Sequence, residues 1–508
     1  MSDGIAAVRC GDRIRGYAEL EERAARVATG LAALDVRAGD RVAIVLRNEP
    51  AFLEISKGVR LVGAVPVPVN WHWTGSDLRH LLHDSGAKVA FAHSDLLPGV
   101  SAVGPEGLAS IEVPVPSELV AAYGLRDFEL TGTCPDFETW LARNAPRTEP
   151  PVPAPMSMIY TSGTTGRAKG IIRDATTPEQ DQLIARLILA GYRLSPSMRT
   201  MVPAPLYHSA PNAHSTTAVA MGADLTIMPR FEAEDFLRLI EKNRIEHVQM
   251  VPTMFIRLLR LDEDVRGRYD LSSLKVVVHA AAKCPVHVKR AMIDWLGPII
   301  HEYYGGSESG IAVTCDTEEW LAHPGTVGKP MPGVDIRILD PDRQPLPANE
   351  VGEIFIHRPP AWPDFRYAND DTGKRAAIEQ DGYWTQGDVG YLDDDGYLHL
   401  TDRATDMVNS GGVNIYPAEI EQVIQTLAGV RDVAVFGAPD EEFGEQLVAH
   451  VDVEPGSGID DRRIQDHVRA RLAGYKVPRL VVLDDDLPRE ESGKLFKRRL
   501  RERYERTY

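Results

Sequence analysis

Apolar residues near the start of the chain follow the period of a helix. Five of them recur at intervals of three or four residues, namely Leu20, Ala24, Val27, Leu31 and Leu34. This spacing places their side chains on one face of an α-helix. We therefore predict an amphipathic helix whose apolar face packs on the core of the first domain.

The following segments predict strands joined by helices. Residues 40–46 and 64–69 are short apolar runs typical of buried strands, and residues 50–62 between them have a helical pattern. Two strands joined through a helix run parallel in one sheet. The same order returns within residues 225–251, with a helix around residues 236–242 between two apolar runs. We predict an α/β fold with two sheets packed against each other.

Changes in residue type along the chain suggest its division into domains. A proline-rich stretch at residues 146–155 is interpreted as an extended connector inside the large domain. Short strands with turn signals, such as residues 393–396, precede the last hundred or so residues, which alternate helix and strand patterns. We predict an N-terminal domain of residues 1–402 and a small C-terminal α+β domain of residues 403–508, with a basic helix at its end.

Composition excludes several classes of protein. The 508 residues are enough to bury large cores, and 43% hydrophobic with 26% charged residues is the composition of an ordinary globular protein. The net charge of −18 argues against a general nucleic-acid or anionic-membrane binder. It leaves open a local positive pocket for one polyphosphate.

The cysteines and the N-terminal segment bear on the compartment. The cysteines are scattered, without a CxxC pair, at Cys10, Cys134, Cys284 and Cys315. This pattern suggests neither a disulfide framework nor a zinc cage. The first residues show no secretory signal, and no apolar run is long enough to span a membrane. We expect reduced thiols and a cytoplasmic protein.

The segment Tyr160–Gly170, YTSGTTGRAKG, has the composition of a phosphate-binding loop. Glycines let the backbone approach a ligand closely, and backbone N–H groups, hydroxyls and a lysine can surround phosphate oxygens. The spacing is not that of a Walker A loop, because Gly170 follows Lys169. The alternative is a flexible Gly/Thr turn.

This segment resembles the phosphate loop of the adenylate-forming superfamily, which includes acyl-CoA synthetases, luciferases and peptide-synthetase adenylation domains. The similarity extends in order over nearly the whole chain. It implies a large domain of packed α/β sheets with a β-barrel-like subdomain, and a small mobile C-terminal domain. It also implies ATP, Mg²⁺ and CoA as cofactor or co-substrates.

The resemblance assigns nucleotide-binding roles by position. In Tyr304–Glu308, YGGSE, the family's aromatic residue stacks on adenine, its hydroxyl meets phosphate (Ser307) and Glu308 binds Mg²⁺. A hydrolase elbow is the rival interpretation, but Ser309 stands where it needs glycine. Asp388 and Arg403 resemble residues that bind the ribose. The remaining nucleotide-binding candidates lie in the loop: Thr161, Ser162, Gly163, Thr164, Thr165 and Gly166.

Further motifs match the family's C-terminal domain and its acyl site. Thr405 falls at the hinge of the family's small domain. Gly411 and Gly412 resemble the glycines that line the tunnel for the pantetheine of CoA. Lys494, in Ser-Gly-Lys, resembles the lysine that neutralises charge during adenylate formation. His208 matches a histidine beside the acyl carboxylate, although a lone histidine is more often structural, and a zinc site with His214 lacks further ligands.

The implied reaction has two steps at one site. The acid attacks the α-phosphorus of ATP, with Lys169, Lys494 and Mg²⁺ at Glu308 stabilising the charge, and the CoA thiol then displaces AMP. Catalytic candidates are thus Lys494, Glu308, His208 and Lys169. The acyl pocket is expected around Tyr207, His208, Met250, Gly305 and Gly306. The small glycines favour a bulky or long acyl group, and no nearby Asp offers an anchor for an amino acid.

Four positions depart from the family pattern. Ala168 and Lys283 stand where proline is usual, Gln386 replaces threonine, and Thr405 replaces the common hinge residue. All four concern nucleotide handling or domain motion. They raise the hypothesis of a variant that adenylates poorly and mainly forms thioesters from an adenylate supplied by a separate enzyme, for example in natural-product biosynthesis.

Other classes remain as alternatives. A luciferase-like enzyme, an acyl-AMP ligase relative, transfer to a separate carrier protein and a non-catalytic sensor are all compatible with parts of the pattern. The family's catalytic motif residues that this sequence retains argue against a non-catalytic sensor. The expected partners are a carboxylic acid or its adenylate and CoA, with no nucleic acid and no integral membrane association. The sequence leaves a homodimer open.

Overall fold

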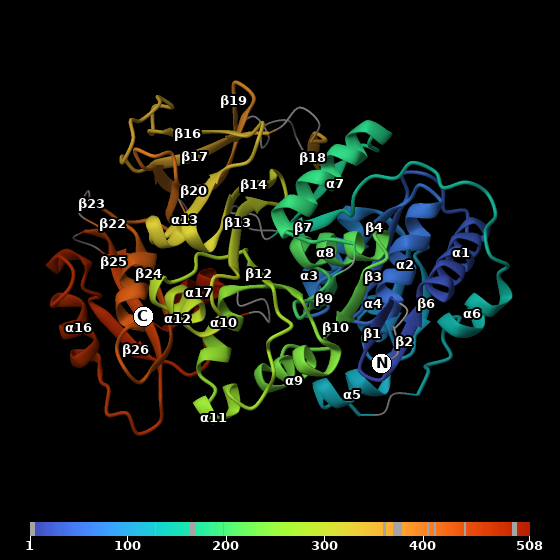
Figure 1. The fold of residues 1–508 in the computed structure, drawn as a ribbon, viewed down its shortest axis with the longest axis horizontal. Coiled ribbons are helices and arrows are strands. Elements are labelled where there is room, and N and C mark those ends of the chain that lie inside the picture. The colour runs from blue at the N-terminus through green and yellow to red at the C-terminus, as the bar shows by residue number, and fades with distance from the viewer. Residues whose placement is uncertain are drawn as a thin grey trace.

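A computed structural model gives the fold (Figure 1). It describes residues 6–126, 129–161, 168–196, 198–358, 362–368, 378–403, 406–410, 413–440, 443–489 and 495–507. The statements below concern these residues.

The first α/β unit is a four-stranded parallel sheet in the order β4-β3-β5-β6. Its strands are β3 (Arg41–Val45), β4 (Val65–Pro68), β5 (Ala87–His93) and β6 (Ala109–Val113). The helices of this part are α1 (Tyr17–Ala33), α2 (Pro50–Leu61), α3 (Gly75–Ser85), α4 (Leu97–Val103), α5 (Ser117–Tyr123) and α6 (Phe137–Arg143). The predicted helix and the strand–helix–strand unit are confirmed, except that Leu34 caps α1 and is 39% exposed.

A 14-stranded sheet has the order β16-β17-β20-β21-β15-β14-β13-β12-β11-β9-β10-β1-β2, with β19 paired to β20. The second unit is the end of this sheet that is parallel except for the edge strand β2, which pairs antiparallel with β1. Its strands on this side are β1 (Ala7–Cys10), β2 (Arg13–Gly16), β9 (Arg199–Val202), β10 (Asp224–Ile227), β11 (His247–Met250), β12 (Val276–His279) and β13 (Ile300–Gly306). Its helices are α7 (Pro178–Tyr192), α8 (Ser209–Ala220), α9 (Ala233–Asn243), α10 (Pro252–Leu259), α11 (Glu263–Arg266) and α12 (Val286–Leu296). The predicted strands β10 and β11 are present, but β9 lies between them.

The other end of the large sheet is antiparallel from β13 onward. The resemblance implied a barrel-like subdomain in this region. The elements are β14 (Gly310–Cys315), α13 (Thr317–Ala322), β15 (Thr326–Pro330), β16 (Asp335–Leu339), β17 (Gly352–His357), β19 (Glu379–Gln380), β20 (Tyr383–Leu392) and β21 (Leu398–Arg403). A separate three-stranded sheet joins β7 (Ile159–Thr161), β8 (Lys169–Arg173) and β18 (Phe365–Tyr367). The proline-rich connector has no regular element and is pinned to the first unit by Val152 N–H, which donates to Leu61.

The C-terminal part has its own hydrophobic core. A cluster of fully or largely buried residues between Val408 and Val468 gathers around a five-stranded sheet in the order β23-β22-β25-β24, with β26 paired to β25. Its elements are β22 (Val408–Ser410), β23 (Val413–Ile415), α15 (Pro417–Gln425), β24 (Val430–Asp440), β25 (Gly444–Val453), α16 (Asp461–Arg469), a 3-10 turn (Gly474–Lys476), β26 (Leu480–Leu483) and α17 (Lys497–Thr507). The predicted basic helix is α17. The domain boundary at residue 403 remains a prediction.

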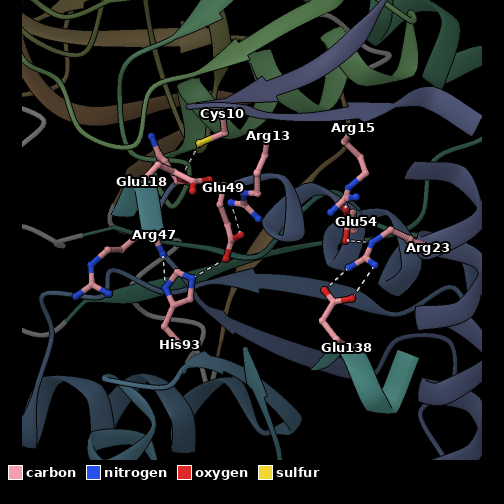
Figure 2. Close-up of polar contacts among 11 residues, drawn as sticks. Cys10, Arg13, Arg15, Arg23, Arg47, Glu49, Glu54, His93, Glu118 and Glu138 are labelled. Carbon is pink, nitrogen blue, oxygen red and sulfur yellow. Dashed lines mark hydrogen bonds and ion pairs between the residues drawn. The ribbon is translucent and has the colours of Figure 1, made fainter. Parts of the chain in front are cut away.

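Buried ion pairs join the N-terminal strands β1 and β2 to the first unit (Figure 2). Glu49, which is almost fully buried, accepts hydrogen bonds from His93 at 2.6 Å and from Arg13 at 2.9 Å. Burial would raise the pKa of the Glu49 carboxyl, but these two partners outweigh it and hold the pKa below its usual range. Arg15 and Arg23 both pair with buried Glu54, but there burial outweighs the two cations and raises the pKa of the carboxyl. Such pairs fix register rather than add much stability.

Among the helices in the described ranges, none combines the length and the apolar character that a bilayer span requires.

Candidate active site

Several residues predicted to take part in catalysis or nucleotide binding lie where the parallel strands of the large sheet end. Tyr304 lies near the carboxyl end of β13, and His208 follows β9 as the N-cap residue of α8. In α/β sheets ligands bind outside the carboxyl ends of the strands. The antiparallel strands β20 and β21 approach the same region from the other side and carry Asp388 and Arg403.

Two predicted nucleotide residues are joined directly. The Tyr304 hydroxyl donates a hydrogen bond of 2.8 Å to Oδ2 of Asp388. Asp388 also pairs in register with Arg403 across β20 and β21. Only the backbone of Arg403 is described, so this register places its Cα and not its guanidinium. The structure thus brings three predicted residues to one place.

The turn that carries Glu308 is held by two arginines. Nη2 of Arg173 donates to the backbone carbonyls of Ser307 and of Glu308, the latter at 3.1 Å. Arg358 donates to the same Glu308 carbonyl at 3.4 Å. Burial lowers the pKa of Arg173 to about 10, although the Glu308 carboxylate opposes the shift. Sequence reasoning missed both arginines, because neither lies in a recognised motif.

Lys169 and Glu308 meet at one tyrosine. The Tyr367 hydroxyl donates to Oε1 of Glu308 at 3.2 Å, and Nζ of Lys169 lies 5.1 Å from the centroid of the Tyr367 ring. This contact follows from the pairing of β18 with β8. A cation over an aromatic face is attracted by the ring quadrupole. Tyr367 therefore orients both a predicted phosphate-binding cation and the predicted magnesium ligand.

Helix α3 contacts the residues that directly precede and follow the glycine-rich part of the predicted phosphate loop. On the first side, the Tyr160 hydroxyl donates to Oδ2 of Asp84 at 2.8 Å. On the second side, Nε2 of His80 lies 2.9 Å from the carbonyl oxygen of Ala168, and so donates to it. Ala168 is the position that lacks the usual proline. The hydrogen bond from His80 restrains the backbone directly before Lys169, and no sequence motif pointed to it.

Gln386 lies against the glycines of the predicted acyl pocket. Its Nε2 donates to Oγ of Ser309 at 2.8 Å, and that hydroxyl accepts from the Gly306 N–H at 3.0 Å. A Cβ atom on Gly306 would come within 1.7 Å of the Gln386 Oε1. A larger residue at 306 would therefore displace the Gln386 side chain from this position.

Lys283 is directed toward the junction with the C-terminal part. Burial lowers the pKa of its ammonium group, while the carboxylates of Asp402, Glu419 and Glu302 act in the opposite direction. Two residues earlier, Ala281 adopts φ 74°, a conformation that alanine rarely takes. Strained backbone of this kind is common at ligand sites. That Lys283, in place of the usual proline, affects nucleotide handling stays a prediction.

The segment before α8 is anchored from the first sheet. Asn48 Nδ2 donates to the Ala204 carbonyl at 2.9 Å, and its Oδ1 accepts from Leu206 N–H at 2.8 Å. The neighbouring Tyr207 is 5% exposed, and its ring lies 4.4 Å, centroid to centroid, from the ring of His208. These contacts fix where the predicted catalytic histidine lies.

Met250 faces a different core from Tyr303. It packs with Met254 and Phe255 in the cluster behind the sheet, whereas Tyr303 belongs to the cluster on the other side. The neighbour Gln249 is fully buried. The acyl-pocket role assigned to Met250 stays a prediction, and its position does not favour it.

Several predicted residues lie outside the described part of the chain. They are Ser162, Gly163, Thr164, Thr165, Gly166, Thr405, Gly411, Gly412 and Lys494. Thr161 ends β7 immediately before them. Their roles remain predictions.

The comparisons with known proteins identify the family of the chain. A family model described as AMP-binding enzyme matches residues 2–361, and one described as AMP-binding enzyme C-terminal domain matches residues 419–494. A feruloyl-CoA synthase of Amycolatopsis is 34% identical over 510 residues, covering 99% of this chain and 97% of that protein. A methyl-dioxo-octahydroindenyl propanoyl:CoA ligase of Mycobacterium tuberculosis is 33% identical, covering 97% and 94%.

A solved structure shows the same fold. The crystal structure of ATP-bound MatB from Rhodopseudomonas palustris superposes with a TM-score of 0.82 at 26% identity, covering 99% of this chain and 97% of that one. The chain therefore belongs to the AMP-binding enzyme family, that is, to the adenylate-forming superfamily, and is an enzyme of its acid–thiol ligase branch.

Proposed function

We propose that this protein is an acyl-CoA synthetase that activates a bulky or long-chain carboxylic acid as an acyl-adenylate and transfers the acyl group to CoA. The observation that carries the proposal is the meeting of Lys169 and Glu308 at Tyr367. It brings the cation Lys169, from the segment predicted to hold phosphates, and the predicted magnesium ligand to one side chain. The names of the relatives, which include CoA synthases and ligases, support the same activity.

In the first step the chain's own charges act on the phosphates. Tyr304 offers its ring to adenine, and Asp388 and Arg403 bind the ribose hydroxyls. Lys169 and the loop from Thr161 to Gly166 bind phosphate oxygens, with Ser307. Lys494 approaches from the C-terminal domain. Preorganised charges of this kind stabilise the transition state because they need not reorganise when charge develops.

Glu308 is the residue that would hold Mg²⁺. A carboxylate oxygen is the hard ligand that this ion prefers, and Mg²⁺ commonly takes one or two carboxylates plus substrate phosphates. Glu308 fits that arrangement as a single carboxylate, and its hydrogen-bond partner Tyr367 also contacts the predicted phosphate-binding cation Lys169. When bound, the ion neutralises phosphate charge.

In the second step the C-terminal domain rotates about Thr405, so that Lys494 leaves and the Gly411–Gly412 side enters. This is a hinge motion. The CoA thiolate forms a bond to the acyl carbon and AMP leaves with the electron pair of the broken C–O bond. His208 lies at the carboxyl end of β9, where it borders the acyl group. We further propose that the enzyme acts in the cytoplasm.

A bulky acyl group is supported by the names of the relatives, because the feruloyl and indenyl-propanoyl groups in them are large. The two glycines add no support, since a Cβ atom on Gly305 would meet the backbone of Gly310 and one on Gly306 would meet the side chain of Gln386.

A second candidate is a variant impaired in adenylation that forms thioesters from a supplied acyl-adenylate. The partly buried ammonium of Lys283, next to the strained Ala281, favours it. The His80 hydrogen bond to Ala168 opposes it, because it restores a restraint that proline would provide.

A split assay separates the two candidates. Pyrophosphate release is measured with ATP, Mg²⁺ and a panel of aromatic, polycyclic and long-chain acids, and acyl-CoA formation is measured separately from synthetic acyl-adenylates and CoA. Activity in both assays is the expected result. Thioester formation without pyrophosphate release from any acid would support the impaired variant, and inactivity in both would refute the proposed function.

A further inference from the structure

The segment that ends in Lys494 is bounded by two residues that pair with each other. Arg489 and Leu495 form an isolated antiparallel bridge, and beside it the Phe496 N–H donates to the Pro488 carbonyl at 2.9 Å. The residues between Arg489 and Leu495 lie outside the described part of the chain. Because Leu495 directly follows Lys494, the contacts that fix this bridge also fix the point at which Lys494 joins the described chain.

A bidentate ion pair ties Arg489 to the sheet of the C-terminal part. Its Nε lies 2.5 Å from Oδ2 of Asp432, and its Nη2 donates to Oδ1 of the same carboxylate at 2.8 Å. Asp432 belongs to β24, and its Oδ1 also accepts from the N–H of buried Val433 at 2.8 Å. Two parallel N–H···O bonds from one guanidinium fix orientation as well as distance. The bridge before Lys494 is therefore held in a defined direction.

The start of β24 also receives a contact from the large domain. Nη2 of Arg260, the C-cap residue of α10, donates to the backbone carbonyl of Arg431. The Arg431 side chain pairs with Asp452 on the neighbouring strand, Nε to Oδ1 at 2.9 Å. Burial lowers the pKa of Arg260, whereas the carboxylates of Asp432 and Asp452 act in the opposite direction. Arg260 thus reaches the same few residues that hold the bridge before Lys494.

The C-terminal part is oriented as the first half-reaction requires. Residues 411 and 412, which act in the proposed second step, fall in sequence between β22 and β23, and Figure 1 shows these two strands at the edge of the molecule, away from α8. The start of α17 has a different surrounding. Burial lowers the pKa of Lys497, but the carboxylates of Glu421, Asp402 and Asp406 outweigh it and raise the pKa. Asp402 directly precedes the predicted ribose-binding residue.

We propose that Arg489, Asp432 and Arg260 are positioning residues for Lys494 in adenylate formation. Asp432 orients the base of the lysine segment through Arg489, and Arg260 holds the start of β24 against α10. The inference rests on the proposed function, because it takes Lys494 to act on the phosphates of ATP. Arg260 and β24 belong to different domains, so the rotation before thioester formation breaks their contact. The three residues therefore serve adenylation alone.

The first test compares the two half-reactions. Adenylation is followed by acid-dependent exchange of labelled pyrophosphate into ATP, and thioester formation by the conversion of a synthetic acyl-adenylate with CoA. We expect Arg489→Met and Asp432→Asn each to reduce exchange by about tenfold, since a misplaced catalytic group slows the chemical step. Arg260→Ala should reduce it severalfold, and all three variants should retain thioester formation. Arg489→Lys should recover little, because an ammonium group cannot form the bidentate pair.

Arg469→Met is the matched control. Arg469 also pairs with an aspartate of the C-terminal part, Asp466, but both residues are exposed on α16. This variant should leave exchange and thioester formation unchanged.

The second test repeats the measurements in a Lys494→Ala background, with ATP affinity from titration calorimetry as a further readout. A residue that acts through Lys494 costs nothing more once Lys494 is gone, whereas structural damage adds to the loss. We expect Lys494→Ala and Arg489→Met each to weaken ATP binding severalfold. The double variant should bind ATP, and exchange pyrophosphate, no worse than Lys494→Ala.

Additive losses in the double variant, or equal losses in both half-reactions, would overturn the inference. Full exchange in Arg489→Met beside a large loss in Lys494→Ala would refute the positioning role and leave the proposed function intact. A wild type that shows the non-additive effect on ATP affinity but exchanges no pyrophosphate with any acid would refute the proposed function and leave the positioning role supported.

Discussion

The Tyr304 hydroxyl and the Asp388 carboxylate are joined by a hydrogen bond of 2.8 Å. The two residues are far apart in sequence and come from the last parallel strand, β13, and from the antiparallel strand β20. The bond holds the predicted adenine-stacking ring and the predicted ribose-binding carboxylate in one orientation before ATP arrives. Such preorganisation reduces the cost of ordering side chains on binding.

Removing this bond should weaken ATP binding. In Tyr304→Phe the ring remains and the tether on Asp388 is lost, which at about 1 kcal/mol for a hydrogen bond corresponds to a KM for ATP that rises about fivefold, with kcat nearly unchanged. Steady-state pyrophosphate release against ATP concentration measures this. Tyr383→Phe is the matched control, because Tyr383 also donates to an aspartate, Asp335, at the far antiparallel end of the sheet. An unchanged KM in Tyr304→Phe would show that the tether is irrelevant to ATP.

The hydrogen bond from His80 to Ala168 should matter for adenylation alone. We expect His80→Ala to lower kcat/KM for ATP by about tenfold, since the backbone before Lys169 loses its restraint. Thioester formation from a supplied adenylate should be unaffected. Ala168→Pro in the His80→Ala background should restore much of the loss, because proline fixes φ and leaves the carbonyl in place.

His83→Ala is the control for that experiment. His83 lies on the same helix and its Nε2 is 3.2 Å from the carbonyl of Val103, away from the loop. Equal losses in His80→Ala and His83→Ala, or no rescue by proline, would mean that α3 acts only through general stability.

Removing one partner of a buried ion pair beneath the site should strongly destabilise the protein, even where the intact pair adds little net stability. Lys289 and Glu302 are nearly inaccessible, and their Nζ–Oε2 distance is 2.6 Å. Lys289→Met leaves a buried carboxylate without its cation, so we expect a loss of about 3–5 kcal/mol of unfolding free energy. Adding Glu302→Leu should recover part of it. Denaturant unfolding followed by fluorescence is suitable, because the Lys289 ammonium lies 5.2 Å from the ring centroid of Trp320.

The exposed pair Lys275–Glu246, 2.5 Å apart, provides the comparison. Its lysine side chain is 62% exposed, so Lys275→Met should cost at most about 1 kcal/mol. A Lys289→Met variant as stable as Lys275→Met would contradict the assignment of a charged buried pair.

The protein should lose stability in mild acid. Burial lowers the pKa of His247 to about 4, whereas an unfolded histidine titrates near 6.5. The unfolded state therefore binds the proton first, and the contribution of His247, complete above pH 6.5, is lost as the pH falls from 6.5 toward 4. Melting temperatures between pH 7.5 and pH 5 should fall less steeply in His247→Gln than in the wild type. Identical slopes would show that His247 does not contribute.

The sequence predicted the elements whose signals are local. The period of the residues from Leu20 to Leu31 identified α1, and the apolar runs identified β3 and β4. It could not place β9 between β10 and β11, because strand order depends on long-range pairing. The predicted apolar face included Leu34, whereas α1 ends at Ala33 and Leu34 is its exposed C-cap residue. The apolar period does not show this end, because a helix terminus is decided by its cap.

For the site, motifs identified residues but not their partners. Tyr304, Glu308 and Asp388 were predicted from local patterns. Tyr367, Arg173 and His80 were not, because each acts through a contact with a segment distant in sequence. The opposite orientations of Gln249 and Met250 on β11 likewise depend on which helices cover each face of the sheet.

Acid-dependent exchange of labelled pyrophosphate into ATP, measured without CoA, tests the central claim most directly. It reports only the formation and reversal of an acyl-adenylate. We predict exchange that requires a bulky acid and Mg²⁺, that is reduced by at least a hundredfold in Glu308→Gln, and that persists in Tyr383→Phe. Absence of exchange with every acid, while the same preparation forms acyl-CoA from synthetic adenylates, would contradict the account and assign adenylation to another enzyme.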